Sequence, residues 1–190
     1  MSPQALDALR ARIQRALTAV QRRAADGFFQ SHVLDDGQRH NYSVTGIKSP
    51  EQLEDELLTL FVWVWSLKDH LKNTYRLRNL DSRVVEDVVN DCVPLQYVSD
   101  IANRAKHGDL RESRSGHFAA LTDVGITIPQ SAISAITVGA FNVGVDVAKP
   151  NEAELRASVQ PQGKAPLDAF AVLTNAIEAW ETRVLHRIAA

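Results

Sequence analysis

The sequence predicts a mainly α-helical protein, a bundle of about four long helices with a small antiparallel β insertion between the third and the fourth helix. Two observations support this fold class. Apolar residues recur at helical spacing over four long stretches, whereas between about residues 118 and 160 they alternate with period two. The chain has 190 residues, 45% hydrophobic and 23% charged, which suits a single domain over residues 1–190.

The first helix is expected over about residues 3–25. Ser2 can cap it, Pro3 suits the first helical position, and the apolar residues that follow keep helical spacing. Turn-forming residues then interrupt this pattern from Asp26 to Ser49. This segment is predicted to be a long connection that can hold a little strand.

The second helix, over about residues 50–78, has the clearest boundary. Ser49 and Gln52 form a capping box around a proline at the first helical position. For two turns around Trp63 and Trp65, apolar side chains cover nearly the full circumference. Such a helix lies at the centre of a fold or at a subunit contact.

The third helix is expected over about residues 82–107, with a kink at Pro94 and its end at Gly108. Period-two alternation then predicts antiparallel strands within about residues 118–160. A fourth helix follows over about residues 166–188.

The second half of the predicted third helix carries a narrow polar stripe. Its members are Asp100, Asn103, Arg104 and His107. A carboxylate, an amide, a guanidinium and an imidazole can together bind phosphate and move a proton. His107 is the candidate acid or base, Arg104 the candidate oxyanion clamp, and Asp100 can orient the imidazole. Two other interpretations stay open: a solvated helix face, or an architectural face hydrogen-bonded to the β insertion.

A second candidate surface lies on the preceding helix, where basic side chains recur at steps of four residues. If the two helices pack antiparallel, these side chains lie near the polar stripe and form a site for RNA or phosphate. The candidate binding residues are Lys68, Asp69, Lys72, Arg76, Asp100 and Asn103. A wider positive patch would add Arg78, Arg83, Lys106, Arg111 and Arg114. Alternatively, these are solubilising charges balanced by nearby acidic residues.

The sequence gives no sign of a metal, a cofactor or a membrane partner. Its six histidines have no zinc-like spacing, and no apolar stretch approaches the roughly 18 residues that a membrane helix needs. Lys and Arg total 21 against 23 for Asp and Glu, so the net charge of -2 gives no whole-molecule attraction to nucleic acid. With a single cysteine, Cys92, and no signal-peptide pattern, the protein is expected in the cytoplasm.

Three short segments carry a resemblance to known proteins. They are Leu67 to Leu71, Asp100 to His107 and Ala176 to Trp180. In this order the chain resembles uncharacterised bacterial helical-bundle proteins, which in turn look like the HEPN superfamily. The resemblance implies a dimerising bundle in a bacterial defence or toxin–antitoxin context. In active members an arginine and a histidine cleave RNA without a metal, and Arg104 and His107 are the matching pair here, closer together in the chain than in those members.

The sequence therefore predicts a homodimeric binding or interaction module that dimerises through helix faces and binds RNA or a cognate protein. The alternative is a metal-independent ribonuclease in which Arg104 and His107 are catalytic. Neither hypothesis requires a cofactor.

Overall fold

The computed structural model describes residues 3–189 and shows a mixed α/β fold in which, over these residues, seven strands form two sheets. The prediction of a four-helix bundle with one small β insertion is therefore wrong. Its error lies mainly in residues 27–45, which form a hairpin and pair with a strand from the predicted insertion. Half of one sheet thus comes from a segment that was expected to be a connection.

The chain forms two compact units, each assembled from segments that are distant in the sequence. One contains residues 3–19, 55–123 and 157–189, and the other contains residues 20–54 and 124–156. Long helices dominate the first and a four-stranded sheet dominates the second, so we call them the helical unit and the sheet unit.

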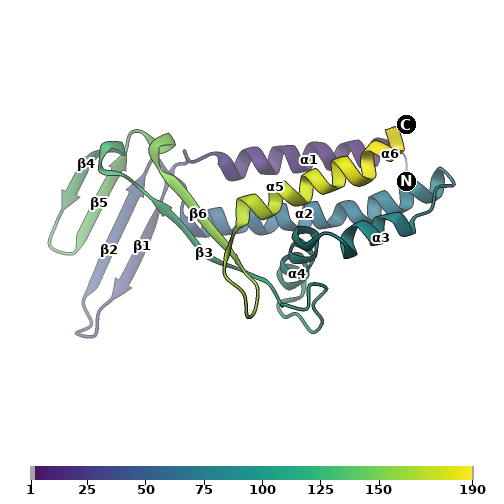
Figure 1. The fold of residues 1–190 in the computed structure, drawn as a ribbon. Coiled ribbons are helices and arrows are strands. Elements are labelled where there is room, and N and C mark those ends of the chain that lie inside the picture. Colours follow the sequence, from purple (N-terminus) through teal and green to yellow (C-terminus); the bar gives the residue numbers. More distant parts are fainter. Residues whose placement is uncertain (1–2, 190) are drawn as a thin grey trace. The chain divides into compact units, whose positions relative to one another are not determined.

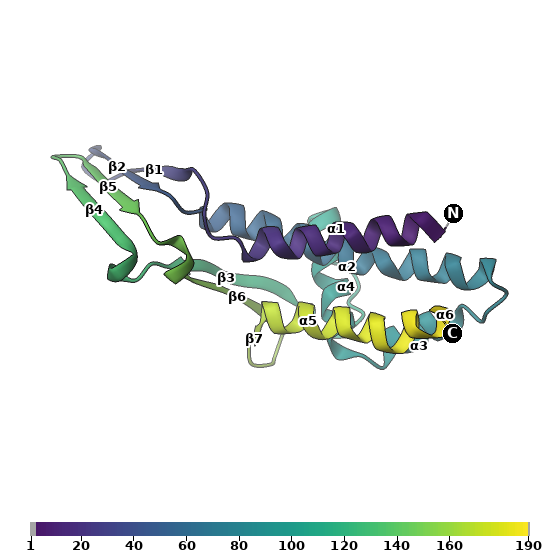
Figure 2. The ribbon, with the colours of Figure 1, turned by 90° about the horizontal axis from the view of Figure 1, so that it is seen from above.

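The helical unit is built around α2. Its helices are α1 (Pro3–Gln21), α2 (Pro50–Leu77), α3 (Arg83–Asn90), α4 (Val93–His107), α5 (Ala169–Trp180) and α6 (His186–Ala189). In Figures 1 and 2, α1, α2 and α5 run alongside one another, whereas α4 runs across their direction. The apolar stripe of α2 is buried almost completely, which places this helix at the centre of the unit.

The beginning of α2 confirms the sequence prediction. The Ser49 hydroxyl accepts a hydrogen bond from the backbone N–H of Gln52 at 3.0 Å. Trp65 is 6% exposed, and the Arg12 guanidinium lies 5.3 Å from the centroid of the half-buried Trp63 ring. Within the chain these contacts cover part of the wide apolar surface of α2, where Val62 and Trp63 remain half-buried.

The predicted kinked third helix is two separate helices. Between α3 and α4, Cys92 has extended backbone dihedrals, with φ -121° and ψ 99°. Pro94 lies in the first turn of α4, where its missing N–H has no helical partner to lose. The proline therefore begins a helix instead of bending one. The end of α4 is as predicted, because Gly108 has a φ of 77° in the left-handed region.

The C-terminal helix begins later than predicted and contains a π-helical turn. The Asp168 carboxylate caps α5 by accepting a hydrogen bond from the backbone N–H of Ala171 at 2.8 Å. After α5, the segment Glu181–Leu185 forms the π turn η3. The Tyr75 hydroxyl on α2 donates a hydrogen bond to the carbonyl oxygen of Val184 in this turn, at 3.0 Å.

The sheet unit contains a four-stranded sheet of order β1-β2-β5-β4. Its strands are β1 (Gly27–Val33), β2 (Arg39–Thr45), β4 (Ile133–Val138) and β5 (Asn142–Val147). The outer pairs β1–β2 and β4–β5 are antiparallel, while the inner strands β2 and β5 are parallel. Both hairpins turn at the same end of the sheet (Figure 1). The pairing of β4 with β5 has one irregularity, between Ile133 and Ala135.

A small core covers one end of one face of this sheet. Its buried members are Ile47, Ala132, Val147 and Ala153. Phe28, Val44 and Val145, which face one another across the strand pairs, pack against it. The 3₁₀ turns η1 (Gln130–Ala132) and η2 (Pro150–Glu152) each contribute to or border this core.

The second sheet has the order β3-β6-β7, with β3 (Ala120–Thr127), β6 (Glu154–Gln160) and β7 (Leu167–Asp168). β6 and β7 are antiparallel. β3 and β6 lie within residues 118–160, where the sequence predicts strands, whereas β7 lies where the fourth helix was expected to begin. Both β3 and β6 begin in one unit and end in the other.

Candidate functional site

Three basic side chains converge on one carboxylate in the helical unit. Lys72 Nζ lies 2.6 Å from Glu86 Oε1, and Arg114 Nη1 lies 2.8 Å from Glu86 Oε2. Lys68 Nζ is 4.0 Å from Glu86 Oε1. We call Lys68, Lys72, Glu86 and Arg114 the cationic cluster.

The members of the cationic cluster come from three elements. Lys68 and Lys72 are four residues apart on α2, and this spacing places both on one side of the helix. Glu86 lies on α3, and Arg114 lies in the loop between α4 and β3. The exposed fraction of the side chain is 16% for Lys68, 25% for Lys72 and 31% for Arg114. The cluster is therefore partly sheltered from water but still reachable from outside.

The ring of Trp65 packs against two cations of the cluster. Lys68 Nζ lies 4.6 Å and Arg114 Cζ lies 5.5 Å from the centroid of a Trp65 ring. Both distances are within the roughly 6 Å over which a cation is attracted to an aromatic face. The almost buried indole thus restricts the positions of two of the three cations.

Glu86 remains ionised over the whole physiological pH range. Burial alone would raise the pKa of this carboxyl group, but hydrogen bonds from Lys72 and Arg114 and the charge of Lys68 lower the pKa to about 2. One negative charge therefore faces three positive ones. Asp69, which lies 3.6 Å from Lys68, is 78% exposed and contributes less because water screens it.

Of the three cations, Lys68 has the longest contact with Glu86. Its contacts with Asp69 and Glu86, at 3.6 Å and 4.0 Å, are ion pairs that are too long to be hydrogen bonds. An ammonium group has three N–H donors. Neither carboxylate takes one of them in this arrangement, so Lys68 can donate to a ligand without breaking a bond to either of these two residues.

Asp100, predicted as part of a reactive stripe, instead anchors the loop that carries Arg114. The carboxylate is fully buried. Its Oδ2 accepts hydrogen bonds from the hydroxyls of Ser113 and Ser115, both at 2.6 Å, and from the N–H of Ala119 at 3.3 Å. Its Oδ1 accepts the backbone N–H of Arg114 at 2.9 Å. Asp100 thereby fixes the backbone from which the Arg114 side chain reaches Glu86.

Among the described residues, the rest of the predicted stripe takes no part in the hydrogen bonds between Asp100 and this loop. The amide of half-buried Asn103 lies 3.5 Å from the Ser99 hydroxyl on its own helix. His107 is exposed at the last position of α4. The Nε of Arg104 is buried and has no hydrogen-bond partner within the described residues. Arg76, predicted with the lysines, lies exposed in the last turn of α2.

The structure thus brings together Lys68 and Lys72 from the predicted binding set and adds partners that sequence reasoning did not place there. Arg114 was expected only as one member of a wide positive patch, and Glu86 was not among the predicted site residues. The step of four between the lysines was the usable signal in the sequence. Glu86 and Arg114 belong to other elements, and only the packing of α3 and the loop held by Asp100 brings them to α2.

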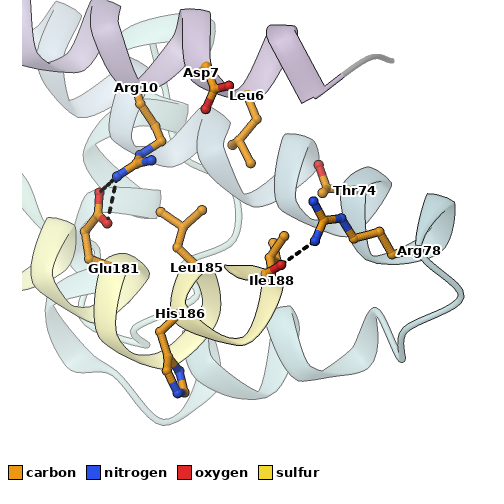
Figure 3. A pocket seen from close by; sticks show the side chains of 9 residues that line it. All are labelled: Leu6, Asp7, Arg10, Thr74, Arg78, Glu181, Leu185, His186 and Ile188. Carbon is orange, nitrogen blue, oxygen red and sulfur yellow. Dashed lines mark hydrogen bonds and ion pairs between the residues drawn. The ribbon is translucent and has the colours of Figure 1, made fainter. Parts of the chain in front are cut away.

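A separate hollow of about 380 Å³ in the helical unit lies between α1, the end of α2 and the C-terminal helices (Figure 3). Leu6, Leu185 and Ile188 give it an apolar wall, while the His186 ring points away from them. Its two arginines already bind groups of the chain: Arg10 pairs with Glu181 at 3.0 Å, and Arg78 donates to the carbonyl oxygen of Ile188. The cationic cluster is therefore the stronger candidate for an anionic ligand.

Within residues 3–189, no group of three or more His, Cys, Asp or Glu side chains is arranged to hold a metal ion. Among the described helices, none has the length and apolar character to cross a membrane.

No protein-family model, curated protein or solved structure matches this chain. The resemblance to HEPN helical bundles is thus corrected on two grounds. No family match supports it, and a mixed α/β fold with two sheets is not a helical bundle. The short matching segments lie on α2, α4 and α5. In two of them a residue has a structural role: Asp100 on α4 accepts hydrogen bonds from the following loop, and the Trp180 indole N–H on α5 donates to the carbonyl oxygen of Val64.

Proposed function

We propose that this protein is a binding module that holds a phosphate group of its ligand at the cationic cluster. The excess of positive charge carries the proposal, because three cations share one carboxylate in a partly buried setting. Phosphate oxygens accept hydrogen bonds from ammonium and guanidinium groups, and the guanidinium fork matches phosphate geometry. A bound phosphate would offset the remaining positive charge.

A diester in RNA and a phosphate of a nucleotide present the same chemistry to this cluster. The cluster is small, and the chain has a net charge of -2. It is therefore suited to contact with one or two phosphates, while a long duplex requires a wider basic surface.

Calorimetric titration tests this proposal with three probes: inorganic phosphate, a nucleoside diphosphate and a short single-stranded RNA. Wild-type protein is expected to bind at least one of them, and Lys68→Gln is expected to weaken that binding by about tenfold or more, the effect of losing one charged hydrogen bond. The probe that binds most tightly identifies the source of the phosphate.

The matched control is Lys164→Gln, which removes an exposed lysine of the turn after β6 and leaves the cationic cluster intact. This variant is expected to bind like wild type. The proposal is wrong if wild type binds none of the three probes, or if the two lysine variants lose affinity equally.

Replacement of the shared carboxylate should act in the opposite direction. In Glu86→Gln the three cations keep their charges but lose the negative charge at their centre. Affinity for the phosphate probe should therefore rise several-fold, and the rise should shrink as salt concentration increases. An affinity that falls in Glu86→Gln, in a protein that is still folded by circular dichroism, would mean that the ligand does not bind among these cations.

Catalysis by Arg104 and His107 is the alternative outcome. The one observation in its favour is the buried Arg104 Nε that has no hydrogen-bond partner within the described residues. Incubation of a mixed RNA pool in excess chelator separates the two proposals. A binding module leaves the RNA intact, whereas fragments from wild type that disappear with His107→Ala would establish a metal-independent ribonuclease.

A further inference from the structure

The four-stranded sheet has an unusual distribution of charge. Its edge strands, β1 and β4, contain no Asp, Glu, Lys, Arg or Pro, whereas the inner strands contain Arg39 and Asp146. Edge strands of soluble proteins usually carry charges or prolines, because their free N–H and C=O groups otherwise pair with another chain. Here both edges lack this protection.

The edge strand β4 also presents apolar side chains that the core leaves uncovered. Ile136 is 60% exposed and Val138 is 74% exposed. By the strand register they share a sheet face with Val143 and Val145. The core packs against the Val145 end of that face, so the end near the hairpin turns remains open.

The opposite edge strand, β1, does not extend this apolar face. On β1 the exposed apolar residues Phe29 and Val33 lie on the opposite face, which also carries the polar side chains of Asn41 and Ser43. On the same face as Ile136 and Val138, β1 presents Gln30 and His32. An apolar surface that continues beyond the sheet therefore continues across β4.

The backbone groups of β4 alternate in direction. The N–H of Gly139 donates to the carbonyl oxygen of Asn142 at 2.8 Å, so this N–H points toward β5. Because backbone groups alternate in direction along a strand, those of Thr137, two residues before Gly139, also point toward β5. The backbone groups of Ile136 and Val138 therefore point outward, away from β5. The two most exposed apolar residues of β4 therefore also supply the outward N–H and C=O groups.

We infer that two copies of this chain pair through β4, antiparallel and centred on Thr137. Ile136 and Val138 are equally distant from Thr137, so a second copy in this register places Ile136 of each chain opposite Val138 of the other. Both residues then exchange backbone hydrogen bonds through groups that already point outward. A two-fold axis perpendicular to the sheet keeps the same face on the same side, so the uncovered apolar ends of the two sheets become continuous.

The properties of β4 identify a second copy of this chain as its pairing partner. β4 is its own complement in residue type, in hydrogen-bond direction and in the absence of charge, and a second copy supplies all three at once. Pairing of β-branched residues directly across two strands stabilises such a contact. The inference stands apart from the cationic cluster, which lies in the helical unit.

Sedimentation of the full chain tests the pairing first. Wild type is expected to be a dimer, and Val138→Lys is expected to be a monomer because it places two positive charges on the shared face. Val138→Pro should also give a monomer, since it removes an outward N–H that the sheet itself does not use. Val33→Lys, which changes an exposed apolar residue on the β1 edge, serves as the control and should remain a dimer.

A disulfide tests the register. Across the axis the two Thr137 residues form a non-hydrogen-bonded pair, with Cα atoms about 4.5 Å apart, within the range that a disulfide spans. Oxidised Thr137→Cys should therefore run as a covalent dimer without reductant, whereas wild type, whose Cys92 is buried, should not. A monomeric wild type, a dimer that survives both Val138 variants, or the absence of a Thr137→Cys crosslink would each overturn the inference.

Discussion

At the scale of single residues, Asp100 shows how one buried carboxylate can organise a surface that it does not touch. It accepts hydrogen bonds from two hydroxyls and two backbone N–H groups of the loop that follows α4. The polar stripe around it looked reactive because carboxylate, guanidinium and imidazole share one helix face. The structure agrees with the architectural interpretation for Asp100, with the loop before β3 as its partner.

Asp100→Ala should lower the free energy of unfolding by about 3 kcal/mol or more, because it leaves several buried donors without an acceptor. Urea unfolding measures this loss. The same variant should weaken phosphate binding, since the backbone of Arg114 loses its anchor. Asp69→Ala, at a side chain 78% exposed, is the control and should change the unfolding free energy by less than about 0.5 kcal/mol. Equal effects of the two substitutions would contradict the anchoring role.

Glu86 gives stability a dependence on acid pH. Its pKa in the folded protein is about 2, below the ordinary value of 4.5. A carboxyl group with a lowered folded-state pKa stabilises the fold above its unfolded pKa, and this contribution disappears as pH falls toward the folded value. Unfolding free energy measured between about pH 5 and pH 2 should therefore fall more steeply in wild type than in Glu86→Gln, by about 1–2 kcal/mol, because water screens these partly exposed ion pairs. Parallel profiles would refute this coupling.

At the scale of elements, the π turn η3 depends on a partner from another helix. A π turn changes the helical hydrogen-bond pattern, and the buried Tyr75 hydroxyl donates to one of its carbonyl groups, that of Val184. Burial raises the pKa of Tyr75, which keeps the hydroxyl protonated as a donor.

Tyr75→Phe should cost about 1–2 kcal/mol of unfolding free energy, because it removes this donor and leaves the Val184 carbonyl unsatisfied. Hydrogen exchange should speed up first in residues 181–189 if the hydroxyl supports the π turn. Thr74→Val is a useful comparison, because the Thr74 hydroxyl bonds only to the His70 carbonyl of its own helix among the contacts seen. A Tyr75→Phe protein with unchanged exchange in this segment would mean that the π turn is stable without the tyrosine.

Local signals predicted α2 and the later strands well and the early hairpin poorly. The capping box at Ser49 and a long apolar stripe define α2 from nearby residues alone. The alternation in β3 to β6 is equally local. In β1, Phe28 and Phe29 are adjacent and point to opposite faces, so the sequence shows no apolar–polar alternation there. In addition, β5, the strand that pairs with the free side of β2, lies about a hundred residues away in the sequence.

At the scale of the whole molecule, the fold class was missed because two separate hairpins complete one sheet. The parallel pairing of β2 with β5 leaves no mark in either segment taken alone. The candidate site shows the same limit, since the lysine spacing on α2 was readable but the arrival of Glu86 and Arg114 from other elements was not.

The sheet unit has a small apolar core of its own, which leads to a prediction about where a core substitution in each unit has its effect. Ile47→Ala in the sheet unit should cost about 2–5 kcal/mol and speed up hydrogen exchange mainly in residues 20–54 and 124–156. Leu71→Ala, at an equally buried position of the helical unit, should loosen mainly residues 55–123 and 157–189. Identical exchange maps for the two variants would show that the units open as one.

The parallel contact between β2 and β5 also sets an order of events during synthesis. The β1–β2 hairpin leaves the ribosome about a hundred residues before the strand that flanks it. At about 5–20 residues per second, this hairpin waits roughly 5–20 seconds with β2 unpaired on one side. No segment synthesised earlier can complete the sheet of β1 and β2. During this interval Phe28 and Val44 of the nascent chain lack the core residues that later cover them. A chaperone would therefore protect the nascent chain most effectively at this stage.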